Sequence, residues 1–486
     1  MAASVAANRA LDARPPAFLP WLLTGALVGV LFLLAAQLEP KWFVVLFLGG
    51  LTVAASLAVS DRKAFYLGLL VFTIPITVDL HLYFRPSTVH HSTHGIVVAL
   101  HHLPLAALYL IWAARLLATR AGPGVSGRGL APLAAFFGAA AASVLLGGAP
   151  LFGAFDLVAL LASVVLFVYA SSQITTRRDL HVVLAALLAT TAVQGGIAIG
   201  QHVTRSSLGL EFLGAYSRTL EGLAVLTRVG GTVGHPNALA LYFDLVLPPA
   251  IALLFAPLRG RTRLLLGIAV SLGLVGLVLT LSRGGIVATG AAGLLLVFLW
   301  LKRVGFLRAL LASLLAVALL LALLLGTPNP VQRRLLREEY PAALARIPLS
   351  HVARNMIADR PLLGVGLNNY ASVAPRYDTT PERVTSWWNA PVHNQILYIA
   401  AETGLVGLLF FLLFLLAVLR ALRPAIRAPD PFVAWTAVGV AVGVGAFLAH
   451  LQIEFDSLTR NSLFWFLSGL AVSLGRLAGA SSRPPS

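Results

Sequence analysis

Three segments of the chain combine arginine or histidine with glycine, serine or asparagine in a way that could bind an anion. They are Arg228-Val-Gly-Gly-Thr-Val-Gly-His-Pro-Asn237, Ser282-Arg-Gly-Gly285 and Pro391-Val-His-Asn394. Each precedes a long apolar run, so each should begin a helix whose free N–H groups and positive dipole end favour an anion. Arginine binds phosphate oxygens bidentately and stays charged. Arg228 and Arg283 therefore predict a site for an anionic headgroup, although a single arginine at a helix end could equally be a membrane-boundary residue.

The third segment adds a group that could move a proton. A neutral imidazole at His393 could act as a general base, and a capping or structural role is the alternative. Asn394, Tyr398 and Glu402 follow at intervals of four residues, so they share one face of the predicted helix. Glu402 would lie about 12 Å along the helix from Asn394, inside the bilayer. A buried carboxylate there must face protein, and we favour a role as structural partner of an arginine or of backbone over direct catalysis.

Other polar residues favour simpler interpretations. His90, His91 and His94 could bind zinc, but neither a cysteine nor a nearby carboxylate completes a ligand set, so a polar loop cap is favoured. The chain has no P-loop and no dinucleotide fingerprint, and Gly364-Val-Gly366 indicates a turn. No metal and no cofactor is therefore expected. Three acids inside predicted spans are interpreted as packing groups: Asp79, Asp156 and Asp244.

The composition indicates whether these residues belong to a soluble protein or to a membrane protein. Hydrophobic residues make up 58% of the 486 and charged residues only 11%, whereas soluble domains average roughly 45–50% and about 25%. Soluble, disordered, collagenous and disulfide-rich classes are excluded, which leaves a protein embedded in a lipid bilayer. The formal charge of +17 then reflects membrane topology, and no nucleic-acid partner is expected.

Runs of about 20 mainly apolar residues predict fourteen membrane helices and an all-α, polytopic integral membrane fold. The predicted spans lie near residues 18–38, 42–60, 64–82, 96–118, 130–148, 151–173, 180–202, 233–256, 264–281, 284–301, 309–326, 393–419, 432–452 and 462–478. Between the eleventh and twelfth spans, short helices are expected over 331–340 and 349–359.

Basic residues in the short connections predict the orientation. With the N-terminus in the cytoplasm, every even-numbered connection carries Lys or Arg on the cytoplasmic side, as the positive-inside rule requires. Both termini are then cytoplasmic, and the long connections near 203–232 and 327–392 face outward. The predicted segments are residues 1–202 with helices one to seven, 203–326 with helices eight to eleven, the outward-facing loop 327–392, and 393–486 with the last three helices.

The order and type of these motifs resemble the O-antigen ligase family, which also contains O-antigen and exopolysaccharide polymerases. The matching pieces, which span about 220–410, are Arg228-x-x-Gly-Thr-x-x-His-Pro-Asn237, Leu281-Ser-Arg-Gly-Gly285, Arg360-Pro-Leu-Leu-Gly-Val-Gly366, His393-Asn-x-x-Leu397 and Ala401-Glu-Thr-Gly-Leu-Val-Gly407. The resemblance implies a metal-independent, inverting glycosyltransferase of the GT-C type in the bacterial inner membrane, with its active site on the periplasmic side.

The resemblance also implies a donor and roles for individual residues. The donor would be a glycan on undecaprenyl pyrophosphate, with Arg228 and Arg283 holding the leaving pyrophosphate and His393 activating the acceptor hydroxyl. Predicted substrate-binding residues are His235, Asn237, Asn394, Tyr398 and Glu402.

The acceptor stays open between lipid A-core, a second lipid-linked glycan and a protein hydroxyl. Fourteen spans lean toward a polymerase, since ligases of the family typically have about twelve. A polysaccharide or lipid-linked oligosaccharide transporter is the alternative function. A transporter should show charges through the middle of several spans and a repeat between its halves, neither of which the sequence shows.

Overall fold

The computed structural model describes residues 40–85, 93–120, 124–215, 228–302 and 341–481, with isolated positions in the gaps and near the N-terminus. Within this part of the chain, nine helices are long and apolar enough to cross a membrane. The all-α, polytopic fold predicted from the sequence is therefore confirmed. The predicted spans at 18–38 and 309–326 lie almost wholly outside the described residues, so the count of fourteen stays a prediction.

The chain forms two compact units, residues 1–66 and 67–486. In the first unit, α3 (Pro40–Ala58) is followed by a short turn and the start of α4 (Arg62–Thr73). Asp61 caps this start, since its Oδ1 accepts a hydrogen bond from the backbone N–H of Ala64 at 2.9 Å. An aspartate at this position satisfies one of the free donors of the first helical turn.

The third and fourth predicted spans differ from the structure. The helix α4 ends at Thr73, and β1 (Asp79–Leu82) pairs antiparallel with β2 (Ile96–Ala99) before α5 (His102–Thr119) begins. The sequence prediction of continuous helix over 64–82 and 96–118 was wrong at these places. The physical reason is Pro75, which cannot donate to a helix and disfavours helical backbone before it, and which is followed by β-branched residues that suit an extended chain.

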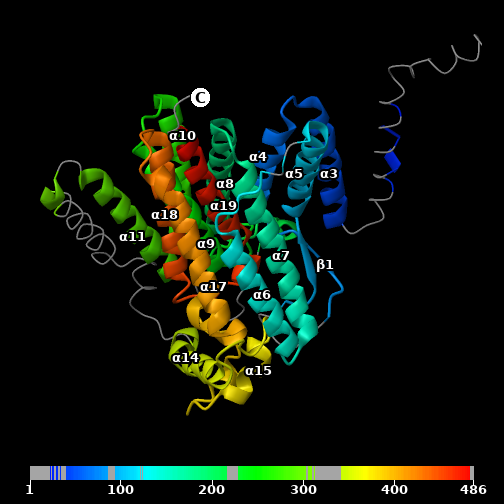
Figure 1. Ribbon diagram of the computed structural model, residues 1–486, viewed down its shortest axis with the longest axis vertical. Coiled ribbons are helices and arrows are strands. Elements are labelled where there is room, and N and C mark those ends of the chain that lie inside the picture. The colour runs from blue at the N-terminus through cyan, green and yellow to red at the C-terminus, as the bar shows by residue number, and fades with distance from the viewer. Residues whose placement is uncertain are drawn as a thin grey trace, which may run out of the picture. The chain divides into compact units, whose positions relative to one another are not determined.

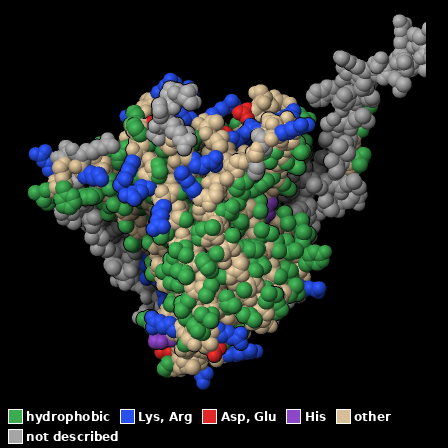
Figure 2. All heavy atoms as spheres, in the orientation of Figure 1, with side chains coloured by type: hydrophobic (Ala, Val, Ile, Leu, Met, Phe, Trp, Pro, Cys, Tyr) green, Lys and Arg blue, Asp and Glu red, His purple; other side chains and the backbone are tan. Residues whose placement is uncertain are grey.

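The later described membrane helices lie within four residues of their predicted spans, except that α17 ends seven residues beyond its span. They are α6 (Leu130–Leu146), α7 (Pro150–Gln173), α8 (Arg177–Thr204), α9 (Pro236–Leu254), α10 (Gly260–Leu279), α11 (Arg283–Leu301), α17 (Gln395–Ile426), α18 (Pro431–His450) and α19 (Ser462–Ser481). In the described part of the chain, the connections also contain the short 3₁₀ turns η1 (Glu211–Leu213) and η3 (Leu458–Arg460). Over α6 and α7, Figure 2 shows a surface of hydrophobic side chains, with Lys and Arg gathered beyond its two ends. This is the surface that a lipid-embedded bundle requires.

The helix α9 is the most enclosed of the apolar helices in the described residues. It packs against α8, α10, α11 and α18, and Figure 1 shows it in the interior of the bundle. Small residues permit the close helix contacts around it: a Cβ on Gly439 of α18 would lie 2.5 Å from the Cα of Pro249. Because α9 is surrounded by protein, any charged residue on it needs a protein partner.

The long loop before α17 has its own helices and core. These helices are α14 (Pro341–Asp359), α15 (Tyr370–Tyr377) and α16 (Val384–Trp387). Their buried side chains include Leu349, Met356 and Tyr370, and α14 and α15 lie together beside the start of α17 (Figure 1). The helix predicted over 349–359 is confirmed and begins earlier, at Pro341, while the one predicted over 331–340 lies outside the described residues.

Candidate active site

The first site element is the start of α9. His235 is its N-cap, and its Nδ1 accepts a hydrogen bond from the backbone N–H of Asn237 at 3.2 Å, with Pro236 in the first helical position. Both residue types suit these positions, because the cap satisfies a free donor and proline has no N–H to lose. The cap directs Asn237 toward Arg228, whose Nη2 donates to Asn237 Oδ1 at 2.5 Å.

The second site element is the tight connection between α10 and α11. Leu281 adopts a left-handed backbone with φ of 51°, and Ser282 caps α11 by accepting a hydrogen bond from the Gly285 N–H at 3.5 Å. Arg283 is the first residue of α11. Arg228 is tied to the same connection, since its Nε donates to the carbonyl oxygen of Thr280 at 2.9 Å. The two arginines predicted to share an anion site are thus held at one place by backbone geometry.

Arg228 and Arg283 line a single pocket with an empty volume of about 350 Å³, part of which opens to solvent. The residues lining it are Arg228, Asn237, Leu281, Ser282, Arg283, Gly284, Arg346, His450, Ile453 and Glu454. Three arginines against one glutamate leave the lining positively charged. With the first turn of α11 beside them, these groups can bind an anion such as a phosphate or pyrophosphate.

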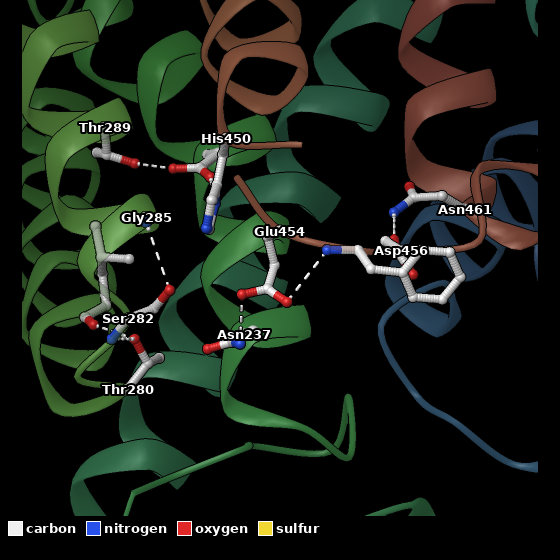
Figure 3. Close-up of polar contacts among 12 residues, drawn as sticks. Asn237, Thr280, Ser282, Gly285, Thr289, His450, Glu454, Asp456 and Asn461 are labelled. Carbon is white, nitrogen blue, oxygen red and sulfur yellow. Dashed lines mark hydrogen bonds and ion pairs between the residues drawn. The ribbon is translucent and has the colours of Figure 1, made fainter. Parts of the chain in front are cut away.

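Glu454 connects the pocket to the predicted base. Its Oε2 accepts a hydrogen bond from Asn237 Nδ2 at 2.7 Å (Figure 3), and it also lies 3.9 Å from Arg346 Nη2. Its Oε1 lies 3.7 Å from His393 Nε2. One carboxylate thus faces the anion pocket on one side and the imidazole on the other.

His393 lies beside the pocket, with 13% of its side chain exposed. Its Nδ1 is 3.1 Å from the carbonyl oxygen of Pro391, and a hydrogen bond in that direction leaves Nε2 as the basic nitrogen. Burial lowers the pKa of His393 below its ordinary value, Glu454 opposes that shift, and Arg346 adds to it. The imidazole is therefore neutral at neutral pH and able to accept a proton.

The end of α18 fixes the position of His393. Asn394 caps α17 by accepting a hydrogen bond from the Leu397 N–H at 3.0 Å, and its Nδ2 donates to the carbonyl oxygen of Gln452 at 3.3 Å. The N–H of Gln395 donates to the Leu451 carbonyl oxygen at 2.9 Å. Asn394 therefore holds two chain segments together and does not line the anion pocket.

Three other predicted binding residues lie outside the anion pocket. His235 is exposed and serves as a helix cap. Tyr398 and Glu402 line a second, mainly apolar cavity with Phe136 and Trp465. Their role in substrate binding stays a prediction. Glu402 does have the backbone partner favoured by sequence reasoning, because its Oε1 accepts a hydrogen bond from the Tyr370 N–H at 3.1 Å.

The region around Glu402 contains a break in α17. Gly404 has φ of 72° and ψ of 179°, a conformation essentially restricted to glycine. The segment of residues 360–366 packs into this break: the N–H groups of Val365 and Gly366 donate to the carbonyl oxygens of Ala401 and Glu402 at 2.8 and 3.0 Å. Gly364-Val-Gly366, predicted as a turn, thus docks the long loop onto α17. This contact connects the loop that carries Arg346 to the helix that begins beside His393.

Asp156, interpreted as a packing group, and His94, interpreted as part of a polar loop cap, both have partners in the structure. Asp156 accepts hydrogen bonds from the hydroxyls of Thr93 and Thr459 at 2.7 and 2.8 Å. Asp79 lies on β1 and not in a helix, which corrects its placement inside a span. His94 packs its ring against Phe152, whereas His90 and His91 lie outside the described residues. No group of three candidate metal ligands occurs among the residues that the structure describes.

Comparison with known proteins adds an independent observation to this geometry. The family model described as O-antigen ligase matches residues 268–412. The chain carries an O-antigen ligase domain. No curated protein matches it.

The O-antigen ligase domain contains only part of the pocket. Arg283 and Arg346 line the pocket from within the domain, and His393, which faces Glu454, is also inside it. Arg228 lies before the domain, while His450 and Glu454 follow it. Sequence reasoning missed Arg346, His450 and Glu454. A usable signal was present for the last two, because the predicted thirteenth span ends on the same face on which the eighth, tenth and twelfth begin.

Proposed function

We propose that this multi-pass membrane protein is a glycosyltransferase that moves a glycan from an undecaprenyl-pyrophosphate donor to an acceptor hydroxyl. The reaction would take place at the periplasmic face of the bacterial inner membrane, with both termini in the cytoplasm. The observation that supports this proposal best is the shared pocket of Arg228 and Arg283, each anchored at a helix start. The O-antigen ligase domain at 268–412 supports the same reaction class.

The proposed reaction is a single inverting displacement of the GT-C type. The acceptor oxygen forms a bond to the anomeric carbon of the donor sugar as the bond from that carbon to the phosphate oxygen breaks. The electron pair leaves with the undecaprenyl pyrophosphate, and the proton of the acceptor hydroxyl passes to His393 Nε2. A neutral imidazole is the form that can take it.

Negative charge develops on the leaving phosphate oxygen, and the two arginines are suited to stabilise it. Both are partly buried, so their attraction for phosphate is screened less than at an open surface. Their bidentate hydrogen bonding replaces the charge stabilisation that a divalent metal gives in other transferases. The protein would therefore act without a metal.

Glu454 is suited to hold the leaving-group site and the base at a fixed position relative to each other. It touches Asn237 on the leaving-group side and lies near His393 on the acceptor side. A carboxylate at this position also lowers the net positive charge of the pocket, which favours release of the pyrophosphate after transfer. The pocket is proposed to bind the pyrophosphate, which the donors of O-antigen ligases and polymerases share. The two reactions therefore differ in their acceptor.

The direct test is transfer by the purified protein in lipid nanodiscs, with an undecaprenyl-pyrophosphate-linked glycan as donor. Arg283→Ala and His393→Ala should each abolish transfer while the unfolding temperature stays near wild type. Arg263→Gln is the matched control, because Arg263 caps the connection before α10 by donating to the Ala256 carbonyl oxygen and lies outside the pocket. Wild-type rates in both active-site variants would overturn the assignment.

The acceptor can be identified from the surface glycan profile of a strain in which the gene is deleted. Loss of all long and short glycan from lipid A-core indicates a ligase, whereas single repeat units on lipid A-core indicate a polymerase. Loss of surface glycan together with accumulation of donor on the cytoplasmic leaflet would instead indicate a transporter.

A further inference from the structure

A buried chain of three polar residues joins three helices behind the anion pocket. Asp244, on α9, is fully buried, and both of its carboxylate oxygens have partners. Oδ1 accepts a hydrogen bond from the hydroxyl of Thr289, on α11, at 2.6 Å. Oδ2 lies 2.6 Å from Nδ1 of His450, at the end of α18. Nothing in the proposed reaction described above uses these residues.

The contact with Asp244 determines which ring nitrogen of His450 carries the proton. A carboxylate that already accepts a hydroxyl proton on one oxygen accepts from an N–H on the other, so His450 carries its proton on Nδ1. The other ring nitrogen, Nε2, can donate to an anion when the ring carries both of its protons. An imidazolium paired with a carboxylate adds no net charge to the buried region behind the pocket.

The second ring nitrogen faces the pocket. His450 lines the pocket with Arg228 and Arg283, and its ring packs on the first turn of α11. A Cβ on Gly284 would lie 2.2 Å from Cδ2 and 2.3 Å from Nε2 of that ring, so only glycine allows this approach. Figure 3 shows the ring extending from α18 into the space between Gly285 and Glu454.

We propose that His450 is a further ligand of the pyrophosphate, donating from Nε2 to a phosphate oxygen beside Arg283, and that Asp244 and Thr289 position it. The inference rests on the proposed function, because it assigns a donor to the same pocket. It explains why an ionisable pair is buried next to an arginine at a helix start, and why two glycines follow that arginine. His450 supplies a directional hydrogen bond where the arginines supply charge.

The test measures the affinity of the detergent-purified full chain for inorganic pyrophosphate by calorimetry. In His450→Asn the shorter amide reproduces the Nδ1 donor to Asp244 and lacks the pocket-facing nitrogen. Its affinity should fall about tenfold or more, as for loss of a hydrogen bond to a charged group. Its unfolding temperature should stay near wild type. A purely structural histidine would give the opposite result, with unchanged affinity, because the bond to Asp244 is kept.

A second variant tests the positioning role of Asp244. Asp244→Asn keeps the side-chain volume but removes the counter-charge of His450, so its affinity for pyrophosphate should also fall. The double variant Asp244→Asn/His450→Asn should bind no more weakly than His450→Asn alone, since Asp244 acts through the histidine. Independent, additive losses would overturn the positioning role. Asp244→Asn also tests the inference if His450→Asn does not fold.

Two further variants separate this inference from the proposed function. His101→Gln is the control for a buried histidine, because His101 lies outside the pocket and contacts Ser462 through Nε2; its affinity should match wild type. Arg283→Ala should lose affinity for pyrophosphate whether or not His450 contributes. Unchanged affinity in His450→Asn with a loss in Arg283→Ala refutes only the role of His450. Unchanged affinity in both variants refutes the pyrophosphate site itself.

Discussion

Asn237 Nδ2 lies 2.7 Å from Glu454 Oε2, and this contact joins the first turn of α9 to the segment after α18. The oxygen of the same amide accepts a hydrogen bond from the Arg228 guanidinium. Glu454 in turn lies 3.7 Å from the imidazole of His393. The arginine proposed to hold the leaving group is therefore connected to the proposed base through only two side chains.

The first prediction concerns this connection. Asn237→Ala and Glu454→Ala should each lower the transfer rate about tenfold or more, because each removes a hydrogen bond to a charged group. The double variant should lose less than the product of the two effects, since both act on one network. Transfer rates of the four proteins measure the coupling. Asn461→Ala, which removes a contact to Asp456 in the same region, is the control, and multiplicative losses would refute the network.

The second prediction concerns pH. The pKa of His393 lies below its ordinary value of 6.5 because the ring is buried, so the neutral base persists as the pH falls to 6.5. Transfer should therefore keep more than half its rate at pH 6.5 and decline only below it. Glu454→Gln should move this decline to lower pH, because Glu454 raises the pKa, and Arg346→Gln should move it to higher pH. Rate–pH profiles provide the measurement, and shifts in the same direction would contradict the electrostatic argument.

The third prediction uses two glycines of the same helix. Gly284→Ala would place a methyl group 2.2 Å from the ring of His450, so it should lower both the transfer rate and stability, the latter by about 1–3 kcal/mol. Gly290→Ala, further along α11, meets no atom within 4 Å. It should leave transfer unchanged and raise stability by about 0.5–1 kcal/mol. Thermal unfolding and transfer assays on both variants check this, and equal behaviour of the two would disprove the close approach.

The fourth prediction tests how the long loop is held. Gly404→Ala would force a side chain into a positive-φ backbone and within 2.0 Å of the Leu362 carbonyl oxygen. We expect a loss of about 2 kcal/mol or more in stability and faster proteolysis in the loop. Gly445→Ala, with open space around it on α18, is the matched control. Limited proteolysis with mass spectrometry locates the cut sites, and an intact loop in Gly404→Ala would count against docking at the helix break.

The fifth prediction concerns metal ions. If the arginines supply the charge stabilisation, transfer should continue at its full rate after dialysis against EDTA. The measurement is the transfer rate before and after chelation, with Mg²⁺, Mn²⁺ or Ca²⁺ added back in turn. A loss of rate that one of these ions restores would refute catalysis by the arginines alone.

The starts of the site helices could be predicted from sequence because the signals are local. Helices were predicted to begin at Ser282 and Asn394, where apolar runs start, and both residues cap those helices in the structure. Pro75 is an equally local signal, in this case against a helix. The apolar run around it nevertheless led to the prediction of a helix where β1 pairs with β2. Hydropathy reports how apolar a segment is and not whether it is helical or extended.

The sequence by itself determined that this chain is a helical membrane protein and that Arg228, Arg283 and His393 begin or precede helices on one face. Only the tertiary structure decided that Glu454 meets Asn237, 217 residues away, and that His450 meets Asp244, 206 residues away. Helical periodicity relates residues within a few turns, so it specifies which face a side chain occupies but not which distant helix covers that face. Those partners depend on how α9, α11 and α18 pack, through contacts such as the one between Gly284 and His450.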